Sequence, residues 1–247
     1  MTAPKRAMIL AAGRGERMRP LTDRVPKPVI PVAGRSALDR MLDRLAGLEL
    51  VVVNACHLAE RIEAAVAARH DPPVIVVREE RVLGTGGGVA NALGLLGEEP
   101  FLVANGDVFL SESPGQAVLE TLVGAWDGDS TDALLLLVER ERARGYRYAG
   151  DFSMTDGSRL VARGGRDTAP FVYASVQIVH PRLLEGAPEG AFSFTLLWDR
   201  AARRGRLRGV VWDGGWMTVD TIDNLAAAGE WLATPIRNHE QGFDRSA

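Results

Sequence analysis

The chain has few cysteine, histidine and lysine residues. Its 247 residues include one cysteine, Cys56, so it cannot form a disulfide within itself. The four histidines show no spacing typical of metal ligands. The net charge is -3, which offers no electrostatic basis for binding nucleic acid. Lysine occurs only at Lys5 and Lys27, because the other basic residues are arginines. Lys27 is thus a lysine kept in a chain that otherwise uses arginine.

Long hydrophobic runs are also missing. No apolar stretch reaches the roughly 18 residues that a membrane-spanning helix needs. Residues 1–10 have no apolar segment followed by a small-residue cleavage site, as a signal peptide would. We therefore expect a soluble, cytoplasmic protein, monomeric or homo-oligomeric, that interacts with neither a membrane nor nucleic acid.

Short apolar runs alternate with amphipathic stretches along most of the chain. Continuous runs of Val, Leu and Ile between helices predict a mostly parallel sheet covered on both faces. The expected strands are 6–12, 50–54, 74–78, 101–105, 132–139, 172–179 and 207–212. The expected helices are 36–48, 58–69, 86–96, 194–204 and 221–232. The fold class is therefore α/β.

The pattern changes after about Arg140, where residues 146–163 are typical of a β-hairpin with a turn at 155–158. We expect one domain over residues 1–235, made of two halves, 1–140 and 141–235. Residues 236–247 form a polar C-terminal tail.

A glycine-containing loop with two cations follows the first expected strand. Gly13 and Gly15 let backbone N–H groups turn toward a ligand, and Arg17 and Lys27 add positive charge suited to a triphosphate. The third glycine of a dinucleotide fingerprint is missing, and so is the Gly-Lys-Ser/Thr of a Walker A loop. The loop favours either a phosphate cradle or a plain tight turn.

Five motifs in a fixed order carry a family resemblance. They are LAAGRGERMRPLT…PKPVIPVAGR from Leu10, LGTGGG from Leu83, Asn105-Gly106-Asp107, Val179-His180-Pro181 and Gly215-Trp216-Met217. In these motifs the chain resembles the sugar-1-phosphate nucleotidyltransferases over nearly its whole length. Within that family it looks most similar to N-acetylmuramic acid 1-phosphate uridylyltransferases. The resemblance implies a Rossmann-like, three-layer α/β/α fold with a mixed central sheet and a smaller sugar-binding β lobe.

The resemblance assigns the nucleotide to residues 1–140 and the sugar to residues 141–235. It implies that Arg17 and Lys27 are catalytic, contacting the triphosphate and the sugar phosphate. The implied nucleotide-binding residues are Ala11, Ala12, Gly13, Gly15, Gly84, Thr85, Gly86 and Asn105. The implied sugar-binding residues are Gly150, Tyr173 and Ser175. Taken alone, the glycine run at 84–88 favours a helix that opens without a ligand over a base-binding loop.

The resemblance also implies a Mg²⁺ cofactor held by Asp107, although Asn-Gly-Asp is a common turn sequence as well. The second metal ligand departs from the family pattern, because Thr218 occupies the usual acidic position. Asp220, two residues later, is either that ligand or the cap of a helix starting near Thr221. Asp213 is a third option.

The function implied is transfer of a nucleotide from an NTP, preferably UTP, to a sugar 1-phosphate, preferably N-acetylmuramic acid 1-phosphate, in cell-wall recycling. Two alternatives stay open. One is a guanylyltransferase acting on mannose or heptose 1-phosphate. The other is a regulatory homologue that binds nucleotides with weak or no catalysis, which Thr218 alone favours.

Overall fold

The computed structural model describes residues 3–112 and 117–234. Its centre is a block of four parallel strands in the order β5-β4-β1-β6. The strands are β1 (Arg6–Leu10), β4 (Leu50–Ala55), β5 (Val74–Arg78) and β6 (Phe101–Asn105). All four were expected as strands from their apolar runs. The predicted tail, 236–247, lies outside the described residues.

The second half of the chain extends this sheet with antiparallel pairs. Strand β11 lies antiparallel to β6 on one side and to β8 on the other, and β12 continues parallel to β8. The short hairpin β9–β10 joins at the far end of β11, where Phe152 pairs with Phe171. These strands are β8 (Ala133–Glu139), β9 (Phe152–Met154), β10 (Leu160–Ala162), β11 (Phe171–Val179) and β12 (Leu207–Val211). The central sheet is therefore mixed, as expected, and the hairpin is continuous with it.

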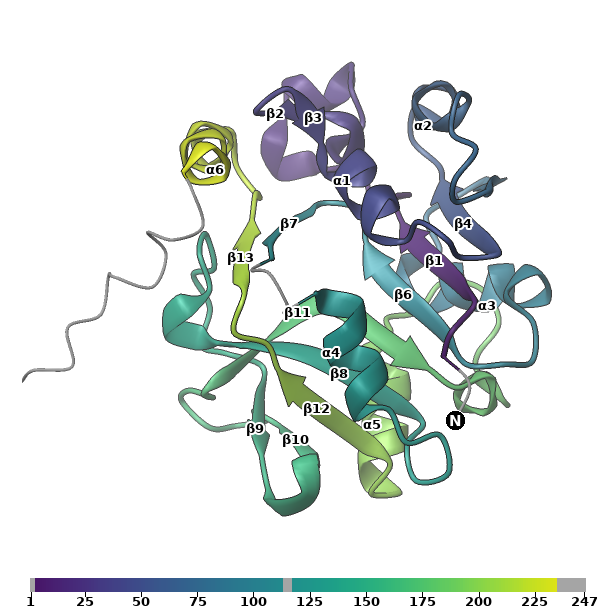
Figure 1. Ribbon diagram of the computed structural model, residues 1–247, viewed down its shortest axis with the longest axis vertical. Coiled ribbons are helices and arrows are strands. Elements are labelled where there is room, and N and C mark those ends of the chain that lie inside the picture. Colours follow the sequence, from purple (N-terminus) through teal and green to yellow (C-terminus); the bar gives the residue numbers. More distant parts are fainter. Residues whose placement is uncertain (1–2, 113–116, 235–247) are drawn as a thin grey trace, which may run out of the picture.

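Helices cover both faces of the sheet (Figure 1). Successive strand residues point to opposite faces: Ala7 and Ile9 pack with α1, α2 and α4, whereas Met8 packs with α3 and α5. The helices are α1 (Ala37–Arg44), α2 (Ala59–Val66), α3 (Gly84–Leu96), α4 (Val118–Ala125) and α5 (Thr195–Arg203). The expected three-layer α/β/α architecture is confirmed.

Two features of the helices differ from the sequence expectation. Helix α1 is shorter than the expected 36–48: the Ser36 side chain caps its start by accepting from the Asp39 N–H, and Gly47 soon turns the chain with a positive φ. Helix α3 begins at Gly84, two residues before the expected start.

Two small antiparallel sheets and a helix were not expected from the sequence. Strand β7 (Val108–Ser111) pairs with β13 (Gly215–Thr218), and β2 (Pro31–Val32) pairs with β3 (Arg35–Ser36). Helix α4 was also missed. The strands are two to four residues long, too short for a clear alternation of apolar and polar residues.

Helix α6 (Ile222–Ala233) follows β13 and packs outside the main sheet (Figure 1). Ala228 and Trp231 of α6 join a separate apolar cluster with Met18, Met217 and Val219. This cluster connects the C-terminal end of the described chain to the turn that follows the glycine loop. It therefore places residue 220, between β13 and α6, near the N-terminal loop.

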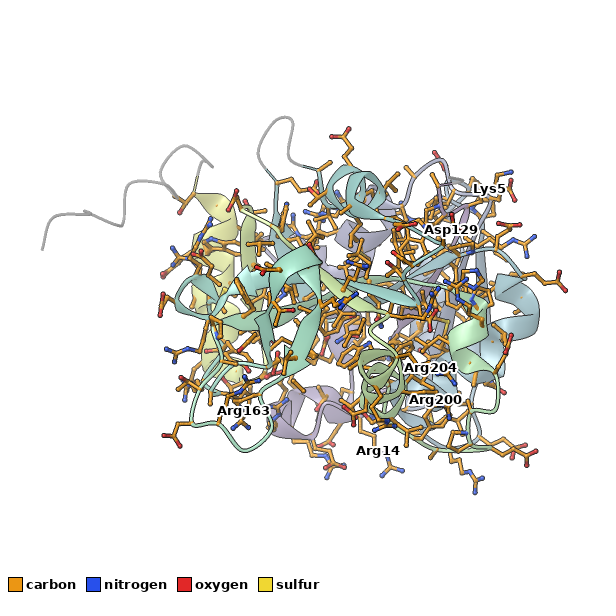
Figure 2. The ribbon with its side chains drawn as sticks, turned by 90° about the horizontal axis from the view of Figure 1, so that it is seen from below. Lys5, Arg14, Asp129, Arg163, Arg200 and Arg204 are labelled. Atoms are coloured by element: carbon orange, nitrogen blue, oxygen red, sulfur yellow. The ribbon has the colours of Figure 1, made fainter. Side chains whose placement is uncertain are left out.

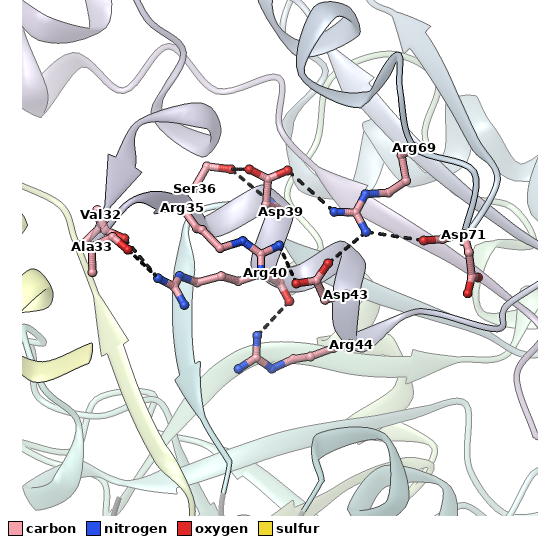
Figure 3. A network of polar contacts seen from close by, with 10 residues as sticks. All are labelled: Val32, Ala33, Arg35, Ser36, Asp39, Arg40, Asp43, Arg44, Arg69 and Asp71. Atoms are coloured by element: carbon pink, nitrogen blue, oxygen red, sulfur yellow. Dashed lines mark hydrogen bonds and ion pairs between the residues drawn. The ribbon is translucent and has the colours of Figure 1, made fainter. Parts of the chain in front are cut away.

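Charged residues hold α1 and its neighbours on the outside of the fold (Figure 3). Arg69 lies between the carboxylates of Asp39 and Asp43, and Arg40 donates to the carbonyls of Val32 and Ala33 in the β2–β3 turn. Figure 2 shows further charged side chains, such as Lys5, Arg14 and Arg204, projecting from the surface. Within residues 3–112 and 117–234, none of the helices has the length and apolar character to cross a membrane.

Candidate active site

A cavity of about 800 Å³ opens at the carboxyl ends of β1, β4 and β6, where parallel sheets of this kind bind their ligands. It brings together residues that are far apart in the sequence. Those among its lining that the sequence singled out are Ala11, Ala12, Gly13, Gly15, Arg17, Lys27, Gly84, Thr85, Asn105, Asp107 and Asp220. Its volume is within the usual range for a small-molecule site.

The glycine loop has the backbone shape that its glycines permit. Gly15 has a left-handed conformation with φ 62°, and a Cβ there would lie 2.9 Å from the Cγ2 of the buried Thr22. Thr22 in turn donates its hydroxyl to the Gly15 carbonyl at 2.9 Å. At Gly13 a Cβ would meet no other atom, so this exposed part of the cavity wall is open to a ligand. The loop therefore offers a bare backbone surface beside its two cations.

Lys27 is the buried cation of the site. Its side chain is 11% exposed, and its Nζ lies 2.7 Å from Asp107 Oδ2 and 2.8 Å from Asp220 Oδ1. Burial lowers the pKa of Lys27, but the two carboxylates outweigh burial and hold the pKa above its usual value. Pro26 and Pro28 flank it in a short 3-10 turn, as their fixed φ angles favour. Lys27 is thus a fully charged ammonium in a defined position.

A chain of polar contacts continues from Lys27 to the rim of the cavity. Asp220 uses Oδ1 for Lys27 and places Oδ2 3.1 Å from Arg17 Nη1. The same Arg17 nitrogen donates to the hydroxyl of Tyr148 at 3.0 Å. Segments far apart in the sequence therefore meet, through ion pairs of Asp220 with Lys27 and Arg17 and a hydrogen bond from Arg17 to Tyr148.

The position of Asp220 distinguishes it from the alternatives. The cap residue of α6 is Thr221, and the Asp220 carboxylate forms ion pairs with Arg17 and Lys27. Asp213 pairs with Arg142 and does not line the cavity, and Thr218 is paired with Val108 in the β7–β13 sheet. Because Asp107 immediately precedes β7 and Asp220 closely follows β13, this antiparallel pairing brings the two aspartates to one place.

The glycine run at the start of α3 is only partly exposed to the cavity. Gly84 and Thr85 line it, whereas Gly86 is buried beneath Phe192. The N–H groups of Gly86 and Gly87 both donate to the Phe192 carbonyl, at 3.0 and 3.2 Å. The run thus packs α3 against the loop before α5 and presents its first two residues to the cavity. A role for Gly86 in nucleotide binding stays a prediction.

The three predicted sugar-binding residues lie outside the cavity lining. Gly150 is buried with φ 86°, and a Cβ there would collide with the Ala169 carbonyl. Tyr173 packs edge-on against Trp198, with ring centroids 4.8 Å apart. Ser175 is buried at the irregularity of β11, with φ 66°. Their sugar-binding roles also stay predictions.

Sequence reasoning did not select Tyr148 or Asn54. Tyr148 is 61% exposed and contacts Arg17, but nothing in its local sequence marks it. Asn54 lines the cavity and is 3% exposed. A signal for Asn54 existed, because it is a polar residue at the carboxyl end of an apolar parallel strand, as Asn105 is.

The carboxylates of Asp107 and Asp220 fit a Mg²⁺ ion. Both place an oxygen on the same ammonium, so they face a common cation position at the cavity wall. Mg²⁺ keeps several waters and is commonly held by one or two carboxylates together with substrate phosphates. Among the described residues no group of three His, Cys, Asp or Glu is close enough to hold a metal by itself, so phosphate and water would complete the coordination.

Fold and site together define an α/β protein with a cavity at the carboxyl ends of its parallel strands, lined by a glycine loop, two cations and two carboxylates. Residues 7–188 match the family of MobA-like NTP transferase domains, and the chain belongs to that family. The resemblance identified from the motifs is confirmed.

Full-length relatives refine this picture. The chain is 42% identical to an N-acetylmuramate alpha-1-phosphate uridylyltransferase from Caulobacter vibrioides, over 91% of this chain and 96% of that protein. It is 36% identical to a protein of the same name from Neisseria meningitidis serogroup B, over 92% and 99%. A solved UDP-glucose pyrophosphorylase in complex with UDP-glucose superposes with a TM-score of 0.76, covering 93% and 98%, at 17% identity, and so supports the fold alone.

Proposed function

We propose that this protein transfers uridylyl from UTP to N-acetylmuramic acid 1-phosphate, forming the nucleotide sugar and pyrophosphate for the recycling of cell-wall sugars. The observation that carries the proposal is Lys27 between Asp107 and Asp220, at the wall of a cavity that opens on a glycine loop. Both relatives matched over more than 90% of the chain have this activity in their names.

Residues 1–140 hold the nucleotide in this proposal, and residues 141–235 contribute to the sugar site. The backbone of Gly13 and Gly15 contacts the phosphates, and Arg17 stabilises the charge that develops on the leaving pyrophosphate. Arg17 is 60% exposed, and its side-chain partners among the residues that the structure describes are Asp220 and Tyr148, so it can turn from them to a triphosphate.

Lys27 acts at the reacting centre. The α-phosphate of UTP and the phosphate of the sugar are both anionic and repel each other. An ammonium between them lowers that repulsion and aligns them. The sugar phosphate is itself the nucleophile and is already ionised, so the reaction needs no covalent enzyme intermediate and no protein base. Positioning and electrostatics therefore account for catalysis.

Mg²⁺ would be held by Asp107 and Asp220 and would supply further neutralisation of the phosphate charges. Lys27 would remain beside these carboxylates, with its ammonium directed toward the phosphates of the substrates. The contacts seen between Lys27 and the two carboxylates thus keep the charges of the site balanced before substrates arrive.

Pyrophosphate release tests this proposal. UTP, GTP and CTP are each combined with N-acetylmuramic acid 1-phosphate and mannose 1-phosphate, with the purified Lys27→Met variant as the control for contaminating enzymes. The proposal expects UTP with N-acetylmuramic acid 1-phosphate to give the highest kcat/KM. A higher value for GTP with mannose 1-phosphate would establish the guanylyltransferase alternative. Triphosphate binding without turnover of any pair would establish the regulatory one.

A further inference from the structure

A buried polar chain links the phosphate end of the cavity to the segment that enters α3. The Asn54 side chain at the end of β4 accepts from the Ala11 N–H at 2.8 Å and donates to Glu79 Oε1 at 2.6 Å. The other Glu79 oxygen accepts from the Leu83 N–H at 3.1 Å. Ala11 opens the glycine loop, and Leu83 directly precedes Gly84, so three hydrogen bonds join the two walls of the cavity.

The side chains that form these hydrogen bonds lie in the protein interior. Asn54 is 3% exposed and Glu79 is 7% exposed, so both polar groups are withdrawn from water. Leaving a buried polar group without its hydrogen bond is costly, which makes each of the three bonds important to the others. No ion pair with Glu79 is found within residues 3–112 and 117–234, so its oxygens are held by N–H donors alone.

A glycine in helix α3 makes space for the side chains of Asn54 and Glu79. A Cβ at Gly88 would lie 2.7 Å from Asn54 Nδ2 and 3.1 Å from Glu79 Oε1. Glycine at this position lets the helix approach closely enough to cover the two side chains. The last glycine of the LGTGGG motif is thus explained by the polar chain beneath it.

We propose that Asn54 and Glu79 are positioning residues that set the distance between the phosphate-binding loop and the base-binding segment at Gly84 and Thr85, and so determine how tightly the triphosphate binds. The proposal rests on the proposed function only in placing phosphates at the glycine loop and the base at Gly84. Neither side chain takes part in the chemistry. Their effect reaches the nucleotide through the backbone of Ala11 and Leu83.

The directions of the hydrogen bonds allow a polarity swap as the test. In Asn54→Asp, two carboxylates face each other. In Glu79→Gln, an amide N–H faces either the Asn54 amide or the Leu83 N–H. The double variant restores every bond, because Asp at 54 accepts from Ala11 and from the Gln amide at 79, whose oxygen accepts from Leu83. Glu80→Gln, the same substitution at the exposed neighbour, is the matched control.

Dissociation constants for UTP, GTP, CTP and ATP are measured by calorimetry, with KM for both substrates and melting temperatures alongside. For the triphosphate that the wild type binds, each single variant is expected to raise Kd by about tenfold. That is the scale of the free-energy cost of one unsatisfied buried group. The KM for the sugar phosphate should change far less. The double variant is expected to bind more tightly than either single variant, and Glu80→Gln to match the wild type.

Two results would overturn the inference. One is single variants that melt at lower temperature but bind the triphosphate like the wild type, which would make the pair purely structural. The other is a double variant that binds no better than the weaker single variant. Failure of the proposed function would give a different result: the wild type would bind a triphosphate but would not turn over UTP with N-acetylmuramic acid 1-phosphate. A wild type that binds none of the four triphosphates overturns both.

Discussion

Replacing Lys27 with methionine removes the ammonium while keeping most of the side-chain volume. In the structure this leaves Asp107 and Asp220 facing each other without the cation that lies 2.7 and 2.8 Å from them. Two separate losses are expected, one in turnover and one in stability, because Lys27 is both a charge for the substrates and the partner of two carboxylates.

The expected sizes follow from the contacts. Removing a positioned electrostatic stabiliser lowers kcat by about 10²–10³-fold. Removing one partner of a fully buried ion pair costs about 3–5 kcal/mol, but Asp107 and Asp220 keep 32% and 19% exposure. Solvent screening reduces the expected loss to about 2 kcal/mol, a fall in melting temperature of about 4–8 °C for a chain of this size.

The assay is pyrophosphate release at saturating substrates, with thermal unfolding followed in EDTA. Lys5→Met is the matched control: it is the same substitution at the other lysine, whose pair with Glu49 is exposed on both sides. That control should behave like the wild type in both measurements, since exposed pairs contribute little. Saturating Mg²⁺ should restore part of the melting temperature that Lys27→Met loses, because the metal neutralises the same carboxylates. It should not restore turnover.

Turnover of Lys27→Met within threefold of the wild type would refute the assigned role at the reacting centre. A melting temperature unchanged in EDTA would instead refute the ion-pair geometry that places Lys27 between the two aspartates.

Three further outcomes are expected. EDTA should abolish activity and Mg²⁺ restore it, and Asp220→Asn should raise the Mg²⁺ concentration for half-maximal activity several-fold while Thr218→Ala leaves it unchanged; equal Mg²⁺ curves would move the second ligand elsewhere. Tyr148→Phe removes an acceptor that Arg17 must leave to reach the triphosphate, so it should lower KM for the triphosphate roughly threefold with no change in melting temperature, and a KM equal to that of the wild type would remove Tyr148 from the site. Asp132 is buried and accepts from Arg182 and Arg206. Burial raises the pKa of Asp132, but the hydrogen bonds from these two arginines outweigh burial and hold the pKa below its usual value. The stability that depends on Asp132 is therefore present above about pH 4 and is lost as the pH falls, so unfolding of Asp132→Asn should depend less on pH in this acid range; parallel pH curves would contradict the assignment.

Much of the first half of the chain, residues 1–140, was predictable because its signals are local. The apolar runs at β1, β4, β5 and β6 are long enough to be recognised as buried parallel strands. Polar and glycine residues directly after such strands lie at the carboxyl edge, and Asp107 and the loop from Gly13 both line the cavity there. Asn54 obeys the same rule and could have been found by it.

The second half of the chain, residues 141–235, was harder to predict. Gly150 and Ser175 were chosen from motif similarity, but their conformations depend on contacts with distant segments, such as the Ala169 carbonyl against Gly150. Tyr148 reaches Arg17 across 131 positions of sequence, a separation that no local pattern encodes. The roles of Gly150, Tyr173 and Ser175 in holding the sugar stay predictions.

By itself the amino-acid sequence determined the α/β class, the parallel centre of the sheet, and the glycine loop that carries Arg17 and Lys27. These follow from residues adjacent in the chain, where strand alternation, proline and glycine act within a few positions. Only the tertiary structure placed Asp220 beside Lys27 and showed that Thr221, not Asp220, caps α6. That placement depends on the pairing of β7 with β13, two four-residue strands about a hundred positions apart, which become strands only when they meet.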